Sequence, residues 1–131
     1  MTNIVTIRDE TTGGGSHNEW SLECLTERIT VRELIRSRVY QEVKDYNLQQ
    51  PDEFRGLVQP TDAKISTNGF RLGSKRTIDW HEQYNKAIEA FEQKRFILLI
   101  NEQQAESLEQ EIEVKPSTEV TFLKLMPLVG G

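Results

Sequence analysis

The stretch TVRELIRSRVYQEVKDY, residues 30–46, contains the clearest helix signal in the chain. It opens with Thr30 and Glu33 at the spacing of a capping box, in which each side chain accepts a hydrogen bond from the other residue's backbone N–H. Apolar residues then recur every three or four positions, as on one face of a helix: Val31, Leu34, Ile35, Val39, Val43 and Tyr46. The sequence therefore predicts a helix over about residues 31–46 with one face in a core.

Two segments before this helix have the pattern of strands. Residues 3–8 are rich in Ile, Val and Thr, which favour strands. In residues 19–25 apolar and polar positions alternate: Trp20, Leu22 and Cys24 against Ser21 and Glu23. The glycine-rich segment 9–18 between them predicts a loop, so the two strands are expected to form a hairpin.

The segment after the helix, residues 47–76, is broken by Pro51 and Pro60. Within it, Asn68-Gly69 predicts the turn of a small hairpin. A second helix is predicted over residues 78–94, where apolar positions are spaced for one face: Trp80, Tyr84, Ala87, Ile88 and Phe91.

Two strands are predicted in the last third of the chain. Residues 96–100, FILLI, are apolar throughout and predict an inner strand that is buried on both faces and lies beside the first strand. Residues 118–125 alternate as a final strand, which Pro127 ends. We expect Leu34, Ile35, Leu98 and Phe122 to be almost fully buried.

These elements predict an α+β fold in a single domain, residues 1–131, with an insertion at about residues 47–94. The net charge of −5 argues against a nucleic-acid partner, which requires a basic surface. A lone cysteine, Cys24, excludes an internal disulfide and a cysteine-rich metal site. Without an apolar signal segment or a long apolar run, we expect a soluble cytoplasmic chain that does not bind a membrane.

The order of these motifs resembles the ubiquitin-like β-grasp family. Residues 30–35, TVRELI, are similar to the helix start of its sulfur-carrier branch, which includes the small subunit of molybdopterin synthase and the thiazole-synthesis carrier. Residues 119–122, EVTF, and the terminal PLVGG, residues 127–131, are similar to the final strand and diglycine end of those carriers, or of a bacterial ubiquitin-like modifier. The resemblance covers about residues 3–46 and 95–131, and Met126 stands where the carriers often have a second proline.

The resemblance implies that the reactive group is the carboxylate of Gly131, within a flexible tail over residues 127–131. An E1-like enzyme would adenylate it with ATP and Mg²⁺ in the enzyme's own site, so this chain would bind no cofactor and would not be an enzyme. Pro127, Leu128, Val129 and Gly130 would thread the partner's channel, which suits glycines because they lack a Cβ. A chain that ends at Gly131 would need no processing protease.

Three functions follow from this resemblance. In the first, Gly131 is conjugated to a protein amine, with an E2-like enzyme and a deconjugating protease as further partners. In the second, Gly131 becomes a thiocarboxylate and passes sulfur to a sulfur-transfer enzyme. In the third, the domain is an adaptor that only binds, and the Gly-Gly end is an inert flexible end.

Other candidate residues have simpler structural explanations. His17 and His81 have no second histidine or cysteine at ligand spacing, so we expect no metal site. We interpret Cys24 as a core residue. Two charged sets are interpreted first as surface charge and second as partner contacts: acidic Glu102, Glu106, Glu109, Glu111, Glu113 and Glu119, and basic Arg28, Arg32, Arg36 and Arg38.

Overall fold

The computed structural model describes residues 3–12, 18–66, 69–73 and 76–125, and these form an α+β structure with a mixed sheet and two helices. The chain divides into two compact units. The described residues of Met1–Glu33 and Gln93–Gly131 form the first unit, and those of Leu34–Glu92 form the second. The second unit contains most of the predicted insertion together with most of the first helix.

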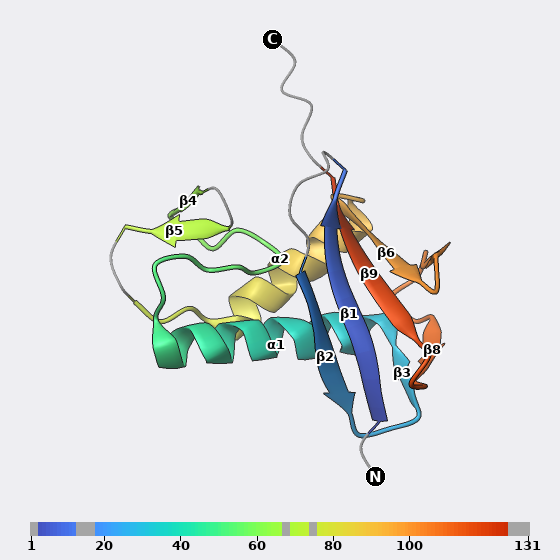
Figure 1. Ribbon diagram of the computed structural model, residues 1–131. Helices are drawn as coiled ribbons and strands as arrows, with labels where there is room; N and C mark the ends of the chain where they lie inside the picture. The colour runs from blue at the N-terminus through green and yellow to red at the C-terminus, as the bar shows by residue number, and fades with distance from the viewer. Residues whose placement is uncertain (1–2, 13–17, 67–68, 74–75, 126–131) are drawn as a thin grey trace. The chain divides into compact units, whose positions relative to one another are not determined.

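The first unit is built on a five-stranded sheet in the order β2-β1-β9-β6-β7 (Figure 1). Its strands are β1 (Asn3–Thr11), β2 (Asn18–Cys24), β6 (Phe96–Ile100), β7 (Gln103–Gln104) and β9 (Glu119–Lys124). The β1–β9 pair is parallel, whereas the β1–β2, β6–β9 and β6–β7 pairs are antiparallel.

This sheet confirms the hairpin of the first two strands and corrects two predictions. Residues 9–11 continue β1 instead of belonging to the loop. The strand Phe96–Ile100 lies beside β9, so the prediction that it neighbours the first strand is wrong. The sequence pattern predicted strands at residues 96–100 and 118–125, but it could not indicate which of the two pairs with β1.

One face of the sheet, here called the inner face, holds the core of the first unit. Its buried side chains come from alternate positions of four strands: Val5, Ile7, Leu22, Cys24, Phe96, Leu98, Val120 and Phe122. Leu98 and Phe122 are fully buried, as predicted. The expectation that β6 is buried on both faces is wrong, because Ile97 and Leu99 on its other side are partly exposed.

A second pair of strands in this unit was not predicted in full. The strand β3 (Arg28–Thr30) pairs antiparallel with β8 (Glu111–Glu113), with Ile29 opposite Ile112. Each of these strands has only three residues, which is too short to show a period in the sequence. Because β3 leads directly into α1 (Val31–Gln49), this pair fixes where the helix begins.

The start of α1 has the predicted capping box. Glu33 N donates to Thr30 Oγ1 at 3.1 Å, and Thr30 N donates to Glu33 Oε1 at 3.4 Å. The helix runs three residues beyond the predicted end, to Gln49. Every apolar residue of the predicted face is buried, and Leu34 and Ile35 are fully buried.

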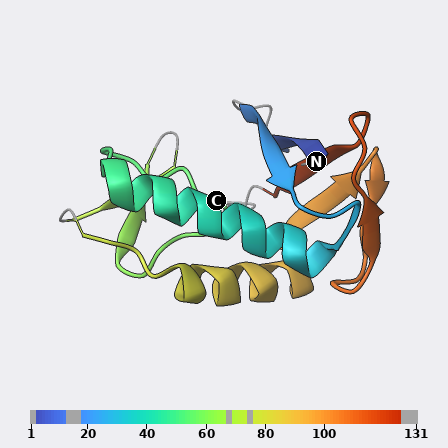
Figure 2. The same cartoon turned by 90° about the horizontal axis from the view of Figure 1, so that it is seen from below.

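The second unit pairs α1 with the predicted second helix, α2 (Trp80–Glu92), which is shorter than expected at both ends. The two helices lie side by side (Figure 2). The Tyr40 and Trp80 rings make an edge-to-face contact with centroids 5.3 Å apart, and the side chain of Asn47 hydrogen-bonds both backbone groups of Ile78. These contacts hold the start of α2 against α1.

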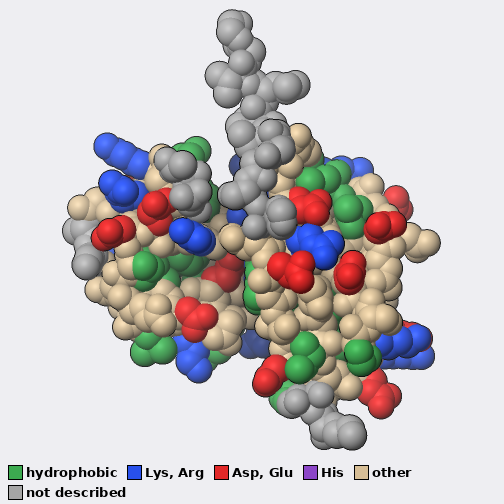
Figure 3. Space-filling view, in the orientation of Figure 1, with side chains coloured by type: hydrophobic (Ala, Val, Ile, Leu, Met, Phe, Trp, Pro, Cys, Tyr) green, Lys and Arg blue, Asp and Glu red, His purple; other side chains and the backbone are tan. Residues whose placement is uncertain are grey.

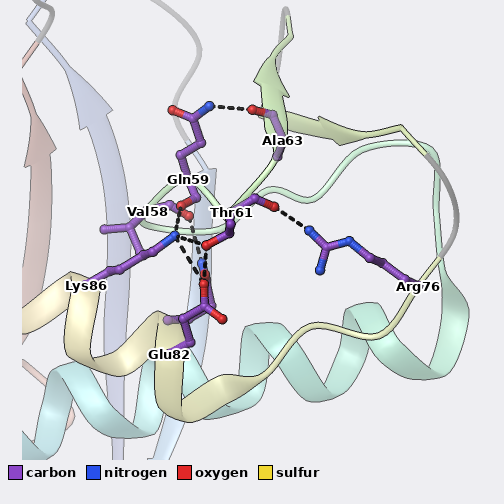
Figure 4. A network of polar contacts seen from close by, with 8 residues as sticks. Val58, Gln59, Thr61, Ala63, Arg76, Glu82 and Lys86 are labelled. Atoms are coloured by element: carbon purple, nitrogen blue, oxygen red, sulfur yellow. Dashed lines mark hydrogen bonds and ion pairs between the residues drawn. The ribbon is translucent and has the colours of Figure 1, made fainter.

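A small antiparallel hairpin, β4 (Ala63–Ile65) and β5 (Phe70–Leu72), confirms the predicted hairpin around Asn68-Gly69, although its turn residues 67–68 lie outside the described part. The segment before β4 is fastened to α2 by polar contacts (Figure 4). Lys86 Nζ donates to Gln59 O at 3.3 Å and to Thr61 Oγ1 at 2.8 Å. Buried Gln83 donates from Nε2 to Val58 O at 3.0 Å.

Arg38 is buried, contrary to its interpretation as a surface charge. Only 1% of the residue is exposed, and its guanidinium lies 3.2 Å from Glu42 Oε2, one helical turn away. The other Glu42 oxygen accepts the backbone N–H of Leu57 at 3.3 Å. Burial of a charged group requires such pairing, which the Arg38–Glu42 pair supplies within α1. The hydrogen bond from Leu57 to Glu42 then connects the helix to the segment that precedes β4.

Replacing Leu34 by Ala tests whether the predicted helix face is a core element. Because Leu34 is fully buried, we expect Leu34→Ala to lower the free energy of unfolding by about 2–5 kcal/mol. Leu48→Ala is the matched control on the same helix, since Leu48 is 75% exposed and its loss should cost less than about 0.5 kcal/mol. Equal effects of the two variants in urea denaturation would show that the buried face is wrongly assigned.

The β6–β7 turn offers a stabilising substitution. Its two residues, Asn101 and Glu102, both have positive φ, 48° and 72°. That geometry favours Asn-Gly. We expect Glu102→Gly to raise the free energy of unfolding by about 1 kcal/mol, because glycine adopts this conformation without strain. Glu106→Gly, at a position without positive φ, should not stabilise the protein; a stabilisation equal to that of Glu102→Gly in thermal denaturation would contradict the explanation.

Candidate functional site

The chain approaches the predicted reactive tail through β9, which is paired along both edges. Residues Thr6 to Thr11 of β1 run parallel to it, and residues Phe96 to Ile100 of β6 run antiparallel to it. At its end Thr12 N donates to Lys124 O at 3.2 Å, and Leu125 N donates to Arg95 O at 3.4 Å. The backbone is therefore fixed by hydrogen bonds up to Leu125, the last described residue.

The predicted tail residues, Pro127, Leu128, Val129, Gly130 and Gly131, lie outside the described part of the chain. The geometry that bears on them is therefore that of the end of β9 and the strands around it. Near this end, Lys124 Nζ lies 4.0 Å from Asp9 Oδ2, and Asp9 is buried. This pair connects the end of β9 to β1.

The side of the sheet opposite to the core, here called the outer face, is apolar near the end of β9. Leu123 and Ile97 are directly opposite each other in the β6–β9 pair, and Leu99 is opposite Thr121. All four side chains are partly exposed, and Leu125 is 38% exposed. These residues form a partly exposed apolar surface beside the end of β9, and surfaces of this kind are typical of contact sites for other molecules.

Farther along the outer face, Arg8 forms an ion pair with two carboxylates. Its guanidinium lies 3.0 Å from Glu19 Oε2 and 3.7 Å from Glu119 Oε2. The hydrogen bond and the negative charge of Glu19 raise the pKa of Arg8. Arg8 thus bridges β2, β1 and β9 across the outer face.

Most carboxylates of the predicted acidic stretch are ion-paired. Arg28 lies 3.7 Å from both Glu111 and Glu113, and Arg32 lies 2.9 Å from Glu109. Lys115 lies 2.9 Å from Glu113, and its hydrogen bond and charge lower the pKa of that carboxyl. Acidic and basic side chains are interspersed on the face shown in Figure 3. Surface charge, the first of the two interpretations, therefore accounts for these ion-paired residues of both sets.

The histidines and the cysteine fall in different places. His17 lies outside the described residues, and His81 is exposed, 3.5 Å from Asp79 and stacked near Trp80. Cys24 is a buried inner-face residue, and burial raises the pKa of its thiol. Among the described residues, no cluster of three or more His, Cys, Asp or Glu side chains has the arrangement of a metal site.

An aromatic cluster around Trp80 was only partly anticipated. Trp80 and Tyr84, on the predicted apolar face of α2, are partly exposed, whereas Phe91 is buried. The guanidinium of Arg36 lies over the Trp80 ring at 5.1 Å, a cation–π contact, beside Tyr40. The signal in the sequence was the four-residue spacing of Arg36 and Tyr40, which places them on one side of α1.

In comparisons with known proteins, no family model, curated protein or solved structure matches this chain. Neither helix in the described part of the chain is long and apolar enough to cross a membrane.

The chemical state of Cys24 gives a direct test of its assignment. A buried thiol with a raised pKa is largely protonated and inaccessible near neutral pH, so we expect native protein to react with iodoacetamide at least about tenfold more slowly than unfolded protein. Mass spectrometry of alkylated protein with and without denaturant measures this ratio. Equal rates in folded and unfolded protein would instead indicate an accessible thiol and reopen a nucleophilic role.

Proposed function

We propose that this chain is a ubiquitin-like β-grasp protein whose Gly131 carboxylate is activated by an E1-like adenylating enzyme and conjugated to a protein amine. The observation that supports this most strongly is the parallel pairing of the last strand with the first, with Ile7 opposite Val120. The proposal requires an N-terminal hairpin followed by a helix and a final strand at the centre of the sheet. The β1–β2 hairpin, the helix α1 and the order β2-β1-β9-β6-β7 support the proposal.

The tail would act as a substrate for its partner. Its carboxylate attacks the α-phosphorus of ATP in the partner's site, pyrophosphate leaves, and an acyl-adenylate forms. A cysteine thiolate of the partner displaces AMP to form a thioester, and an amine of the target protein then displaces that thiolate to form an amide bond. The nucleophilic cysteine and Mg²⁺ belong to the partner, so this chain binds no cofactor and is not itself an enzyme.

The active form must have a free carboxylate on Gly131. It exists either because the protein ends there or because a processing protease cleaves after Gly131. Two glycines suit an enclosed channel because neither has a Cβ, and Pro127 cannot donate a backbone hydrogen bond to a neighbouring strand. The apolar outer face around Leu123 supplies the surface on which the E1-like partner docks.

Sulfur carriage is the second candidate, and the sequence PLVGG at residues 127–131 favours it because of its similarity to the carriers' end. In that case a sulfur donor displaces AMP and leaves a thiocarboxylate on Gly131. The compact unit Leu34–Glu92 favours conjugation, since a small metabolic carrier has no need of such a unit. A binding adaptor with an inert tail is the third candidate.

Intact-mass spectrometry after incubation with the cognate adenylating enzyme, ATP and Mg²⁺ separates the three candidates. Conjugation adds the mass of a whole protein, sulfur transfer adds the mass difference between sulfur and oxygen, and an adaptor keeps its mass. We expect conjugates in the presence of a target protein. A thiocarboxylate without conjugates would contradict the first candidate, and an unchanged mass would contradict the first two.

Deleting Gly131 or making Gly130→Ala tests the tail itself. We expect either change to abolish adenylation, measured by pyrophosphate exchange, because the carboxylate is displaced or a Cβ obstructs the channel. The melting temperature should not change, since the last buried side chain of the described part is Phe122. Gly73→Ala is the control, because a Cβ there meets nothing within 4 Å. Full adenylation of the variant without Gly131 would contradict the proposal.

A further inference from the structure

The strand β2 is an open edge of the five-stranded sheet. It is seven residues long, and within the described part of the chain its only neighbour is β1. The opposite edge, β7, has two residues and offers little backbone for pairing. Edge strands of this length are usually protected by proline, a bulge or charged side chains. β2 contains neither proline nor lysine, and its exposed charges are those of Glu19 and Glu23.

The register identifies the backbone groups that face outward from β2. Thr6 N and Thr12 N donate toward β9, so even-numbered residues of β1 face β9 and odd-numbered residues face β2. The partners of the odd residues are Asn18, Trp20, Leu22 and Cys24. The N–H and C=O groups of Glu19, Ser21 and Glu23 therefore point away from the sheet, where another strand can pair with them.

The side chains of β2 present different chemistry on the two faces. Glu19, Ser21 and Glu23 are exposed on the outer face, whereas Trp20, Leu22 and Cys24 lie on the inner face. Glu19 shares its charge with Arg8. Glu23 has no ion pair among the described residues, and its neighbour on β1 is the exposed Ile4.

This arrangement disfavours pairing with a second copy of the chain. If two β2 strands paired antiparallel about Ser21, Glu19 of each copy would stand directly opposite Glu23 of the other. Like charges at directly opposite positions destabilise a strand pair. The two glutamates thus oppose self-association but favour a strand with positive charges at the matching positions.

We propose that β2 binds an extended segment of a partner protein by strand addition, and that this segment has Lys or Arg at two positions four residues apart. An antiparallel segment would place these cations opposite Glu19 and Glu23, with a small polar residue opposite Ser21. The second and fourth residues of this five-residue stretch lie opposite Leu22 and Trp20, so their side chains point to the inner face. We therefore expect these two residues to be apolar. The recognised pattern is basic–apolar–polar–apolar–basic.

The charge of the first unit supports a basic partner. Segments 1–33 and 93–131 contain 12 Asp and Glu against 7 Lys and Arg, so the whole net charge of −5 belongs to them. A net negative charge increases the rate at which a basic segment arrives at the edge. This proposal does not depend on the chemistry of Gly131, and a chain with an inert tail would bind in the same way.

The test uses the full chain and the fluorescein-labelled peptide Thr-Lys-Val-Thr-Val-Lys-Thr, with fluorescence anisotropy as the readout. We expect saturable binding and amide chemical-shift changes confined mainly to residues 18–24. Glu23→Lys should weaken binding about tenfold, through loss of attraction and added repulsion. The same variant should gain affinity for the peptide in which both lysines are glutamate, which a merely unfolded variant would not do.

Ser21→Pro tests the backbone. Proline at Ser21 removes an outward N–H and leaves the bonds to β1 intact, so binding should be lost while the melting temperature is retained. If this variant unfolds, the backbone is tested instead with a peptide whose central Thr is N-methylated, which removes one interstrand hydrogen bond without altering the protein. We expect the methylated peptide to bind at least about tenfold more weakly than the unmodified one. Absence of saturable binding by the unmodified peptide would overturn the proposal. So would equal binding of the methylated peptide, since attraction by net charge alone would then explain the affinity.

Discussion

The parallel pairing of β1 with β9 is the interaction on which the first unit depends. It joins segments more than a hundred residues apart in sequence and places β9 between β1 and β6, so that Ile7, Val120, Phe122 and Leu98 share one buried face. Parallel strands cannot be joined by a tight turn, so all the residues between β1 and β9 serve as the connection between these two strands. The same pairing leaves β2 at one edge and fixes the backbone from which residues 126–131 continue.

Features set by local chemistry were predicted from the sequence. The capping box of Thr30 and Glu33, the buried face of α1 and the alternation in β2 depend on neighbours within a few residues. Pairing partners were not predictable in the same way, since FILLI at residues 96–100 is equally apolar beside β1 or beside β9. The burial of Arg38 could not be predicted from its neighbours in sequence either. It depends on the ion pair with Glu42, which also accepts a hydrogen bond from the backbone N–H of the distant Leu57.

The features of the candidate site also differ in whether they could be predicted from the sequence. The diglycine end was identified from sequence alone, because its proposed chemistry belongs to the backbone carboxylate and needs no second residue of this chain. The apolar outer face and the open edge of β2 emerge only when strand order and register are known, since Ile97 and Leu123 become neighbours through the β6–β9 pair. Together they give the first unit two surfaces with different chemistry: one apolar beside the end of β9, the other acidic along β2.

The arrangement of β9 is tested most directly by nuclear Overhauser effects between backbone protons of neighbouring strands in isotope-labelled protein. Parallel pairing predicts cross-peaks between the neighbourhoods of Ile7 and Val120, together with antiparallel cross-peaks between Leu98 and Phe122. Cross-peaks from β1 to residues 96–100, without any to residues 119–124, would contradict the sheet order and remove the main support for the β-grasp proposal.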